Sequence, residues 1–288
     1  MRNRRDFIKK ASLWFAGGIM APKLLASCEL RKYLGLQLYS LRDMVGDEGI
    51  RKTLEVVANM GYTHLETADY RNGKFYGENP ADLKKMVEEL GMQLTSSHLS
   101  RNITEDRNAD MAWWNTAVEA HSEAGMKYMV VPSSPLRGEN ATFDNVKRYC
   151  DYFNDIALLT AGSNMQFGYH NHAFEFENKV NGVPVFDMML EQTNPAHVTF
   201  QLDVYWIKMG GYDPVEYMKK YANRFKLLHI KDETAIGAQK TVDYKAVFDT
   251  AYAIGVKDWF VEVERYDETP QEDVQKSADF LLNADFVK

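Results

Sequence analysis

Two histidines lie two residues apart in the segment FGYHNHAFEF, residues 167–176. His170 and His172 are two of only seven histidines in the chain, and Glu175 follows shortly after them. If this segment is a strand, both imidazoles face the same side, because side chains alternate along a strand. Hydrogen bonds within the strand could satisfy them. Alternatively, they could bind a metal ion with ligands from elsewhere in the chain.

Three more residues of metal-ligand type follow apolar runs later in the sequence. Asp203 ends VTFQLD, His229 lies in FKLLHI, and Glu262 lies in DWFVEVE. Such groups are costly to bury unless they are paired or bound to a metal. Together with His170 they make two imidazoles and two carboxylates, a set that suits Mn²⁺, Co²⁺, Fe²⁺, Zn²⁺ or Mg²⁺. We predict one divalent ion at these four residues, and the sequence leaves its identity open.

Further polar residues near the ends of apolar runs are candidates for catalysis or substrate binding. We assign catalysis to Glu262, His172 and Lys231, and Lys231 shares a strand face with His229. Glu264 points the same way as Glu262 and is the alternative to it as a ligand. Ordinary packing or solvent exposure would also explain Lys231 and Trp206. We expect substrate contacts from Gln37, Tyr39, Glu66, His98, Glu175, Trp206 and Glu264.

The elements that position these residues repeat along the chain. Eight short β-rich runs alternate with amphipathic helical stretches, and several of these stretches end in Gly, as at Gly61, Gly91, Gly125 and Gly255. Eight such pairs predict an α/β fold, a single-domain (β/α)8 TIM barrel, whose active site lies where the strands end. An open doubly wound sheet is the alternative, but no Gly-rich turn follows the first run. The runs are residues 34–40, 63–68, 93–98, 127–132, 165–170, 198–203, 225–230 and 258–264.

The chain resembles the xylose-isomerase-like TIM barrels, a group of sugar isomerases, epimerases and inosose dehydratases. The resemblance is carried by LGLQLYSLRD, GYTHLE, SSHLS, YHNH, LDVYW, HIKD and VEVERYD. It implies a divalent metal held by Glu, Asp, His and Glu at the ends of strands five to eight. The last three ligands match Asp203, His229 and Glu262. The first departs, because His170 stands where the family commonly has a glutamate that also serves as an acid/base group.

The resemblance also sets the expected chemistry. A divalent ion that holds a carbonyl and a hydroxyl helps a base to remove the proton next to the carbonyl. We expect a metal-dependent sugar isomerase or epimerase that acts in this way. The alternative is a dehydratase or lyase that eliminates from a keto-sugar, keto-glycoside or inosose-like substrate, since His170 removes one of two matched bases. A non-catalytic carbohydrate-binding protein is a third interpretation.

The first 27 residues have the layout of an export signal, with a basic start, an apolar stretch and small residues at the exit. Arg4 and Arg5 followed by Phe7 resemble a twin-arginine signal, and LASC resembles a lipobox that ends at Cys28. We expect the catalytic domain to span residues 28–288. We also expect an exported protein, periplasmic or anchored to the membrane by lipid on Cys28.

Composition limits the partners. With 45% hydrophobic residues among 288, the chain can bury a large core. Once the leader is set aside, 28 basic and 40 acidic residues remain, a net charge of −12. This balance argues against nucleic acid. The family resemblance, in turn, implies a small carbohydrate substrate. Only Cys150 is then left as a free thiol, so no intrachain disulfide is expected. The sequence leaves the oligomeric state open.

Overall fold

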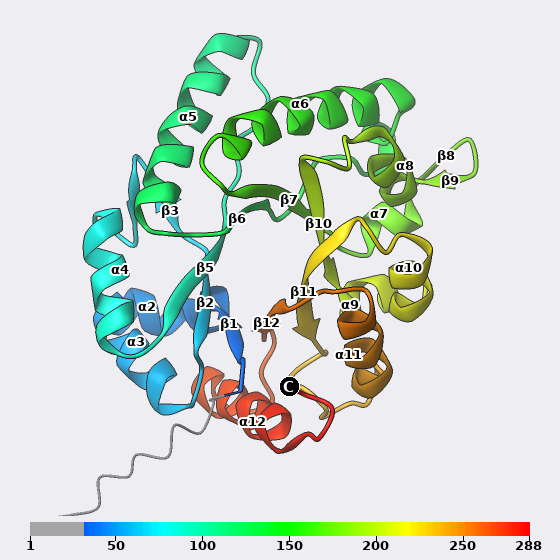
Figure 1. Ribbon diagram of the computed structural model, residues 1–288. Coiled ribbons are helices and arrows are strands. Elements are labelled where there is room, and N and C mark those ends of the chain that lie inside the picture. The colour runs from blue at the N-terminus through cyan, green and yellow to red at the C-terminus, as the bar shows by residue number, and fades with distance from the viewer. Residues whose placement is uncertain (1–31) are drawn as a thin grey trace, which may run out of the picture. The chain divides into compact units, whose positions relative to one another are not determined.

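The computed structural model describes residues 32–288, and within them eight parallel strands close into a barrel (Figure 1). Around the barrel the strand order is β1-β12-β11-β10-β7-β6-β5-β2, so sequential strands are neighbours and the last pairs with the first. The predicted single-domain TIM barrel is confirmed. The strands are β1 (Gly35–Gln37), β2 (His64–Thr67), β5 (Gln93–His98), β6 (Tyr128–Val131), β7 (Gln166–His170), β10 (Val198–Asp203), β11 (Phe225–Lys231) and β12 (Asp258–Glu262).

Helices surround the barrel on its outside (Figure 1). They are α2 (Arg42–Glu48), α3 (Ile50–Asn59), α4 (Pro80–Glu89), α5 (Arg107–Glu123), α6 (Phe143–Ala161), α7 (Phe174–Glu177), α8 (Val185–Gln192), α9 (Val204–Met209), α10 (Pro214–Lys220), α11 (Tyr244–Ala253) and α12 (Pro270–Asn283). Short 3₁₀ helices lie at Leu38–Leu41 and Gly138–Asn140. Two small hairpins are inserted, β3 (Tyr70–Arg71) with β4 (Lys74–Phe75) and β8 (Lys179–Val180) with β9 (Val183–Pro184).

Local sequence signals explain where the helices begin and end. An Asp or Thr side chain accepts a hydrogen bond from the first turn of several helices, which satisfies backbone N–H groups that have no helical partner. These residues are Asp106, Thr142, Asp203, Asp213, Asp243 and Thr269. The four predicted stop glycines all have positive φ, between 74° and 96°.

The hydrophobic core lies mainly between the barrel and its helices. Inside the barrel a smaller apolar cluster consists of Tyr128, Val130, Leu227 and Phe260. Gly35 permits close approach of β1 to β12, because a Cβ there would lie 2.0 Å from the carbonyl oxygen of Trp259. The inward residues nearer the strand ends are polar. The barrel interior is therefore apolar near the strand starts and polar beneath the expected site.

The first strand is shorter than predicted. The sequence predicts an extended segment over residues 34–40, but the chain turns into a 3₁₀ helix at Leu38. The Gln37 side chain accepts a hydrogen bond from the backbone N–H of Tyr39 and so caps this turn. Buried Leu38 and Leu41 hold the turn against the core. The pattern of apolar residues alone does not distinguish this turn from a strand.

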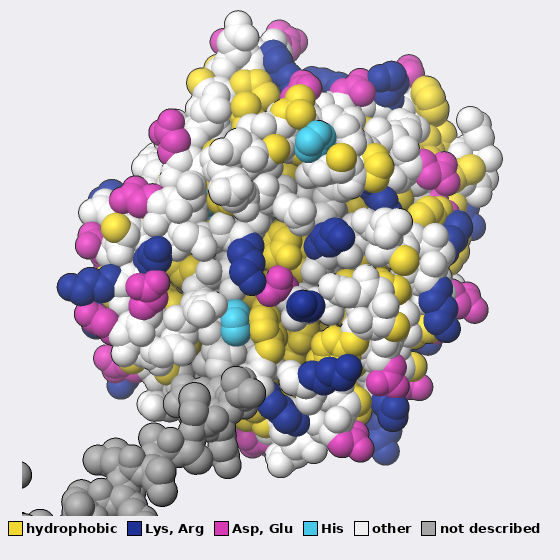
Figure 2. Space-filling view, viewed as in Figure 1, with side chains coloured by type: hydrophobic (Ala, Val, Ile, Leu, Met, Phe, Trp, Pro, Cys, Tyr) yellow, Lys and Arg dark blue, Asp and Glu magenta, His cyan; other side chains and the backbone are white. Residues whose placement is uncertain are grey.

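The predicted export and membrane anchoring depend on the first 28 residues. The predicted leader and Cys28 lie outside the described residues. Among residues 32–288, no helix is long and apolar enough to cross a membrane. On the face drawn in Figure 2, acidic and basic side chains both occur, as expected from the mixed charge of the sequence.

Candidate metal centre

The four predicted metal ligands lie together where β7, β10, β11 and β12 end. One donor atom from each of His170, Asp203, His229 and Glu262 lies within 4.8 Å of the others, and all four residues are buried. His170 Nε2 and His229 Nδ1 each lie 4.0 Å from Asp203 Oδ2. His229 Nδ1 is 3.4 Å from Glu262 Oε2. Residues far apart in sequence converge here because neighbouring parallel strands end at the same rim.

Two buried atoms of this cluster have no hydrogen-bond partner in the described part of the chain. They are Asp203 Oδ2 and His229 Nδ1. Asp203 uses its other oxygen, Oδ1, to accept hydrogen bonds from the backbone N–H groups of Tyr205 and Trp206, at 2.9 and 2.7 Å. A buried polar atom without a partner is costly. A cation bound between these atoms would satisfy both, so the residues present fit a divalent metal.

The electrostatics of His170 and Glu262 agree with this fit, whereas Asp203 is only partly ionised at neutral pH when no cation is bound. Burial raises the pKa of Asp203 to about 7, which Lys231 and His229 offset only in part. Burial, followed by the charge of His229, lowers the pKa of His170 well below its usual value and keeps this imidazole neutral. Burial opposes ionisation of Glu262, but Lys231 and His229 outweigh it and hold its pKa well below the usual range. Neutral imidazoles and ionised carboxylates are the forms that bind metal.

His229 also departs from its metal-binding form when no metal is bound. Burial lowers its pKa, but the charges of Glu66 and Glu262 outweigh burial and raise it to about 10. A protein without metal therefore carries an extra proton on this imidazole at neutral pH. Because an ion can bind only the unprotonated nitrogen, metal binding at His229 would release that proton.

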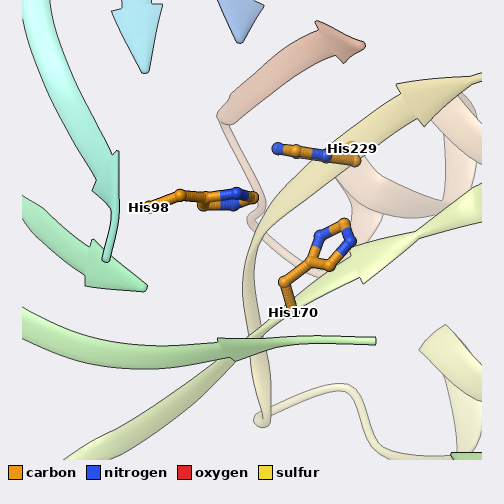
Figure 3. Close-up of side chains that lie close together, drawn as sticks. All are labelled: His98, His170 and His229. Atoms are coloured by element: carbon orange, nitrogen blue, oxygen red, sulfur yellow. The ribbon is translucent and has the colours of Figure 1, made fainter. Parts of the chain in front are cut away.

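A third imidazole belongs to the same neighbourhood. Figure 3 shows His98 and His229 with nearly parallel rings and His170 turned edge-on to them. The rings of His98 and His229 are stacked with centroids 4.9 Å apart, and His170 meets them at centroid distances of 5.1 and 4.6 Å. These three histidines also place donor atoms close enough for a metal ion. However, His98 Nε2 is 2.7 Å from Gln201 Oε1, within hydrogen-bond distance.

The cluster opens into a cavity of about 390 Å³. Six of the predicted site residues line it, namely Tyr39, His98, His170, His172, Glu262 and Glu264. The His172 ring is partly buried, and its Nδ1 has no partner among the described residues. Both imidazoles of the YHNH segment therefore reach the site, one in the metal cluster and the other in the cavity wall.

Lys231 and Trp206 lie immediately behind this wall. Lys231 Nζ is 3.1 Å from Glu262 Oε2 and 2.8 Å from Glu264 Oε2. It also lies over the Trp206 ring, 5.7 Å from the centroid. The Trp206 ring packs against His172 with centroids 5.6 Å apart. Lys231 thus neutralises and orders two cavity carboxylates, and Trp206 supports both Lys231 and His172.

Four predicted substrate contacts do not line the cavity, namely Trp206, which lies behind its wall, and Gln37, Glu66 and Glu175. Gln37 and Glu66 are fully buried inside the barrel, where the Gln37 amide donates to the Glu66 carboxylate at 2.8 Å. Glu175 is also fully buried, on the first turn of α7. Its carboxylate accepts hydrogen bonds from Tyr169 Oη at 2.5 Å and from the backbone N–H of His172 at 2.8 Å. The strand turns into a helix here, so Glu175 braces the loop that carries His172.

Other residues of the site have only weak sequence signals. The cavity wall includes Asp69, Tyr70 and Arg71, at and just before the β3–β4 hairpin, and Ser100 and Ser133 in loops after β5 and β6. Loop residues of this kind show no periodicity that marks them. Ser96 and Gln201, by contrast, lie two residues before His98 and Asp203 on the same inward faces. Alternation along the strand could have identified them.

Comparisons with known proteins agree with the barrel. Residues 54–284 match the family described as xylose isomerase-like TIM barrel. The inosose dehydratase of Geobacillus kaustophilus is 24% identical over 197 residues, which span 63% of this chain and 61% of that protein. That of Geobacillus thermodenitrificans is 24% identical over 258 residues, with 76% and 83% covered. A solved sugar phosphate isomerase/epimerase from Parabacteroides distasonis is 37% identical with a TM-score of 0.84, covering 94% of this chain and all of that one. The chain belongs to the xylose isomerase-like TIM barrel family.

Proposed function

We propose that the protein is a divalent-metal-dependent carbon–oxygen lyase that eliminates a β-oxygen from a keto-sugar or keto-glycoside. The observation that carries this proposal is the uneven set of acid and base groups around the cluster of His170, Asp203, His229 and Glu262, with imidazoles at the end of β7 and carboxylates at the end of β12. These four residues would hold the ion. When bound, a divalent ion supplies a positive charge that polarises a carbonyl and stabilises negative charge developing on its oxygen.

The acid and base groups are distributed unevenly around the cluster. Glu262 and Glu264 line one part of the cavity, and both contact the buried ammonium group of Lys231. At the end of β7 the chain offers imidazoles, His170 and His172, and Glu175 is turned away toward Tyr169. A two-base epimerase needs matched groups on both faces of the substrate. Elimination needs only one base and one acid, which this arrangement supplies.

We assign the roles from geometry. His172 lines the cavity, and burial lowers its pKa to about 4, so its imidazole is unprotonated at neutral pH and can accept the proton removed next to the carbonyl. Lys231 contacts both Glu262 and Glu264. A proton of its ammonium group can therefore pass through one of these carboxylates to the leaving oxygen. The removed proton and the departing oxygen are then served by different residues.

The inosose dehydratases among the relatives support this proposal, because a dehydratase is a carbon–oxygen lyase. A specific observation supports a second candidate. The Parabacteroides distasonis structure, which matches at 37% identity, is described as a sugar phosphate isomerase/epimerase. A sugar isomerase also begins with proton removal next to a carbonyl, so the same cluster would serve it.

Products identified by NMR in D₂O would separate the two candidates. We expect the purified, metal-loaded protein to consume a member of a panel of keto-sugars and 3-keto-glycosides and to form an unsaturated product. Deuterium should enter at the carbon next to the carbonyl in recovered substrate if the first step is reversible. Rapid aldose–ketose interconversion without any unsaturated product would contradict the lyase proposal and support the isomerase. The Asp203→Asn variant is the matched inactive control.

A further inference from the structure

Glu66 is a buried carboxylate surrounded by hydrogen-bonding groups, and it does not reach the cavity. Its Oε1 lies 2.5 Å from His229 Nε2, 2.8 Å from Gln37 Nε2 and 3.2 Å from His98 Nε2. Its Oε2 lies 2.6 Å from Ser96 Oγ and 2.9 Å from Gln201 Nε2. The groups around it come from several strands of the barrel. An ionised carboxylate can only accept hydrogen bonds, so it fixes the direction of every bond around it.

The backbone N–H of Tyr39 sets the direction of these hydrogen bonds at Gln37. The N–H of Tyr39 can only donate, and it donates to Gln37 Oε1 at 3.1 Å. The other end of the Gln37 amide, Nε2, must then donate to Glu66 Oε1. Glu66 Oε1 is therefore an acceptor. His229 must present a protonated Nε2 to it, which leaves Nδ1 to face Asp203 and Glu262.

The second imidazole ligand, His170, is oriented through Gln201. The amide nitrogen Nε2 of Gln201 donates to Glu66 Oε2, so the amide oxygen Oε1 of Gln201 faces the other way. That oxygen lies 2.7 Å from His98 Nε2 and 3.2 Å from His170 Nδ1. His170 must then carry its proton on Nδ1, which leaves Nε2 free on the side of Asp203. The two imidazoles thus face the metal position through different ring nitrogens.

We propose that Glu66 is a positioning residue that directs the metal-facing nitrogens of both imidazole ligands, of His229 directly and of His170 through Gln201. This inference rests on the proposed metal site. Groups that hold the second nitrogen of a metal-bound imidazole typically change metal affinity about 10- to 100-fold when they are removed. Here one carboxylate does this for two imidazoles at once.

Replacement of Glu66 by Gln makes a specific prediction. The amide oxygen that Glu66→Gln introduces can still face Gln37 and His229, but the new NH₂ group then meets the NH₂ group of Gln201. Gln201 must turn over and present its NH₂ group to His170 Nδ1, which becomes an acceptor. The proton of His170 moves to Nε2 and blocks the nitrogen that faces the metal position. The double variant Glu66→Gln, Gln201→Glu exchanges the carboxylate and the amide, so His170 again donates from Nδ1.

The test combines ¹⁵N NMR of the histidine side chains with Zn²⁺ titration in a calorimeter. In metal-free protein we expect the His170 proton on Nδ1 in wild type, on Nε2 in Glu66→Gln, and on Nδ1 again in the double variant. Zn²⁺ should bind about 10- to 100-fold more weakly to Glu66→Gln, and the double variant should recover at least part of that loss. Asp187→Asn is the matched change at a buried carboxylate away from the cluster, since Asp187 accepts from Tyr217, Lys220 and Tyr221. It should leave Zn²⁺ affinity within about threefold of wild type, a difference under about 0.7 kcal/mol.

The outcomes are distinct. Unchanged His170 tautomer and Zn²⁺ affinity in Glu66→Gln would overturn the inference and leave the proposed metal site intact. If wild type binds no divalent ion, the proposed function fails, and this inference fails with it. Should Glu66→Gln not fold, the wild-type spectrum still decides, because a proton on His170 Nε2 in that protein contradicts the inference.

Discussion

The two carboxylate oxygens of Asp203 have different roles, since one caps a helix and the other faces the proposed metal site. Oδ1 accepts hydrogen bonds from the first turn of α9, while Oδ2 is buried without a partner among residues 32–288. Substitution by Asn can keep the helix cap and removes only the negative charge and one acceptor. At this position a loss of metal binding can therefore be separated from a loss of fold.

Glu175 allows a residue-scale prediction about pH. Burial raises its pKa from 4.5 to about 8, and its hydrogen bonds from Tyr169 and His172 offset this only in part. A carboxyl group whose pKa is raised by folding adds stability that is fully present below about pH 4.5 and is lost as pH rises through about 8. Between about pH 4.5 and pH 8, the free energy of unfolding of wild type should fall by up to about 1.4 kcal/mol per pH unit relative to that of Glu175→Gln.

Urea unfolding at pH 5.5, 7 and 8.5 measures this difference. Glu177→Gln is the matched control, because Glu177 is exposed on the same helix, α7. It should follow wild type at each pH. Parallel curves for wild type and Glu175→Gln would show that Glu175 ionises normally in the folded protein.

The sequence identified the residues that converge at the strand ends better than those that line the cavity, and the reason is depth along the strands. His170, Asp203, His229 and Glu262 could be brought together by topology alone, because all four follow apolar runs. Glu66 also lies in such a run, but its side chain sits below the rim and serves the imidazoles instead. The number of residues between the rim and a side chain depends on register between strands, which one sequence does not reveal.

At the scale of elements, the loops after β5 and β6 separate the main cavity from a second cavity of about 250 Å³. Ser100 and Ser133 line both. The second cavity also contacts Asn102, Arg137 and Tyr149. If the substrate is a keto-glycoside, the group attached to the sugar has room here. The hairpin and loop residues that shape this space carry no periodic signal, so the sequence did not predict it.

Asn102→Trp should fill the second cavity without touching the main one. We expect kcat/KM for a glycoside with a bulky substituent to fall about tenfold or more, equivalent to about 1.4 kcal/mol. A methyl glycoside should be affected by less than about threefold, under about 0.7 kcal/mol. Asn108→Trp, on the exposed side of α5, is the matched control. Equal losses for both substrates would show that the substituent does not occupy this space.

At the scale of the whole molecule, the fold was predictable because its signals repeat. Eight alternations of strand and helix signals point to a closed barrel, and a local error such as the shortened β1 does not change that count. The proposed metal site depends on closure, since its four candidate ligands come from four strands that no local segment holds together. Metal binding should therefore be coupled to the stability of the barrel as a whole.

Removal of the metal tests this coupling. A ligand that binds only the folded state adds about 2.7 kcal/mol at a concentration about 100 times its dissociation constant. For a chain of this size, that should raise the Tm by about 5–10 °C. We expect wild type treated with EDTA to melt lower by this amount and to recover when Mn²⁺ or Zn²⁺ is returned.

Two variants complete the test of metal coupling. Asp203→Asn should melt at one temperature with or without metal. Asp213→Asn, which alters the corresponding cap of α10, should respond as wild type does, because Asp213 Oδ1 accepts from Val215 and Glu216 away from the cluster. A wild-type Tm that is unaffected by EDTA and by added metal would contradict the coupling, because the four ligands would then hold no ion that distinguishes the folded from the unfolded chain.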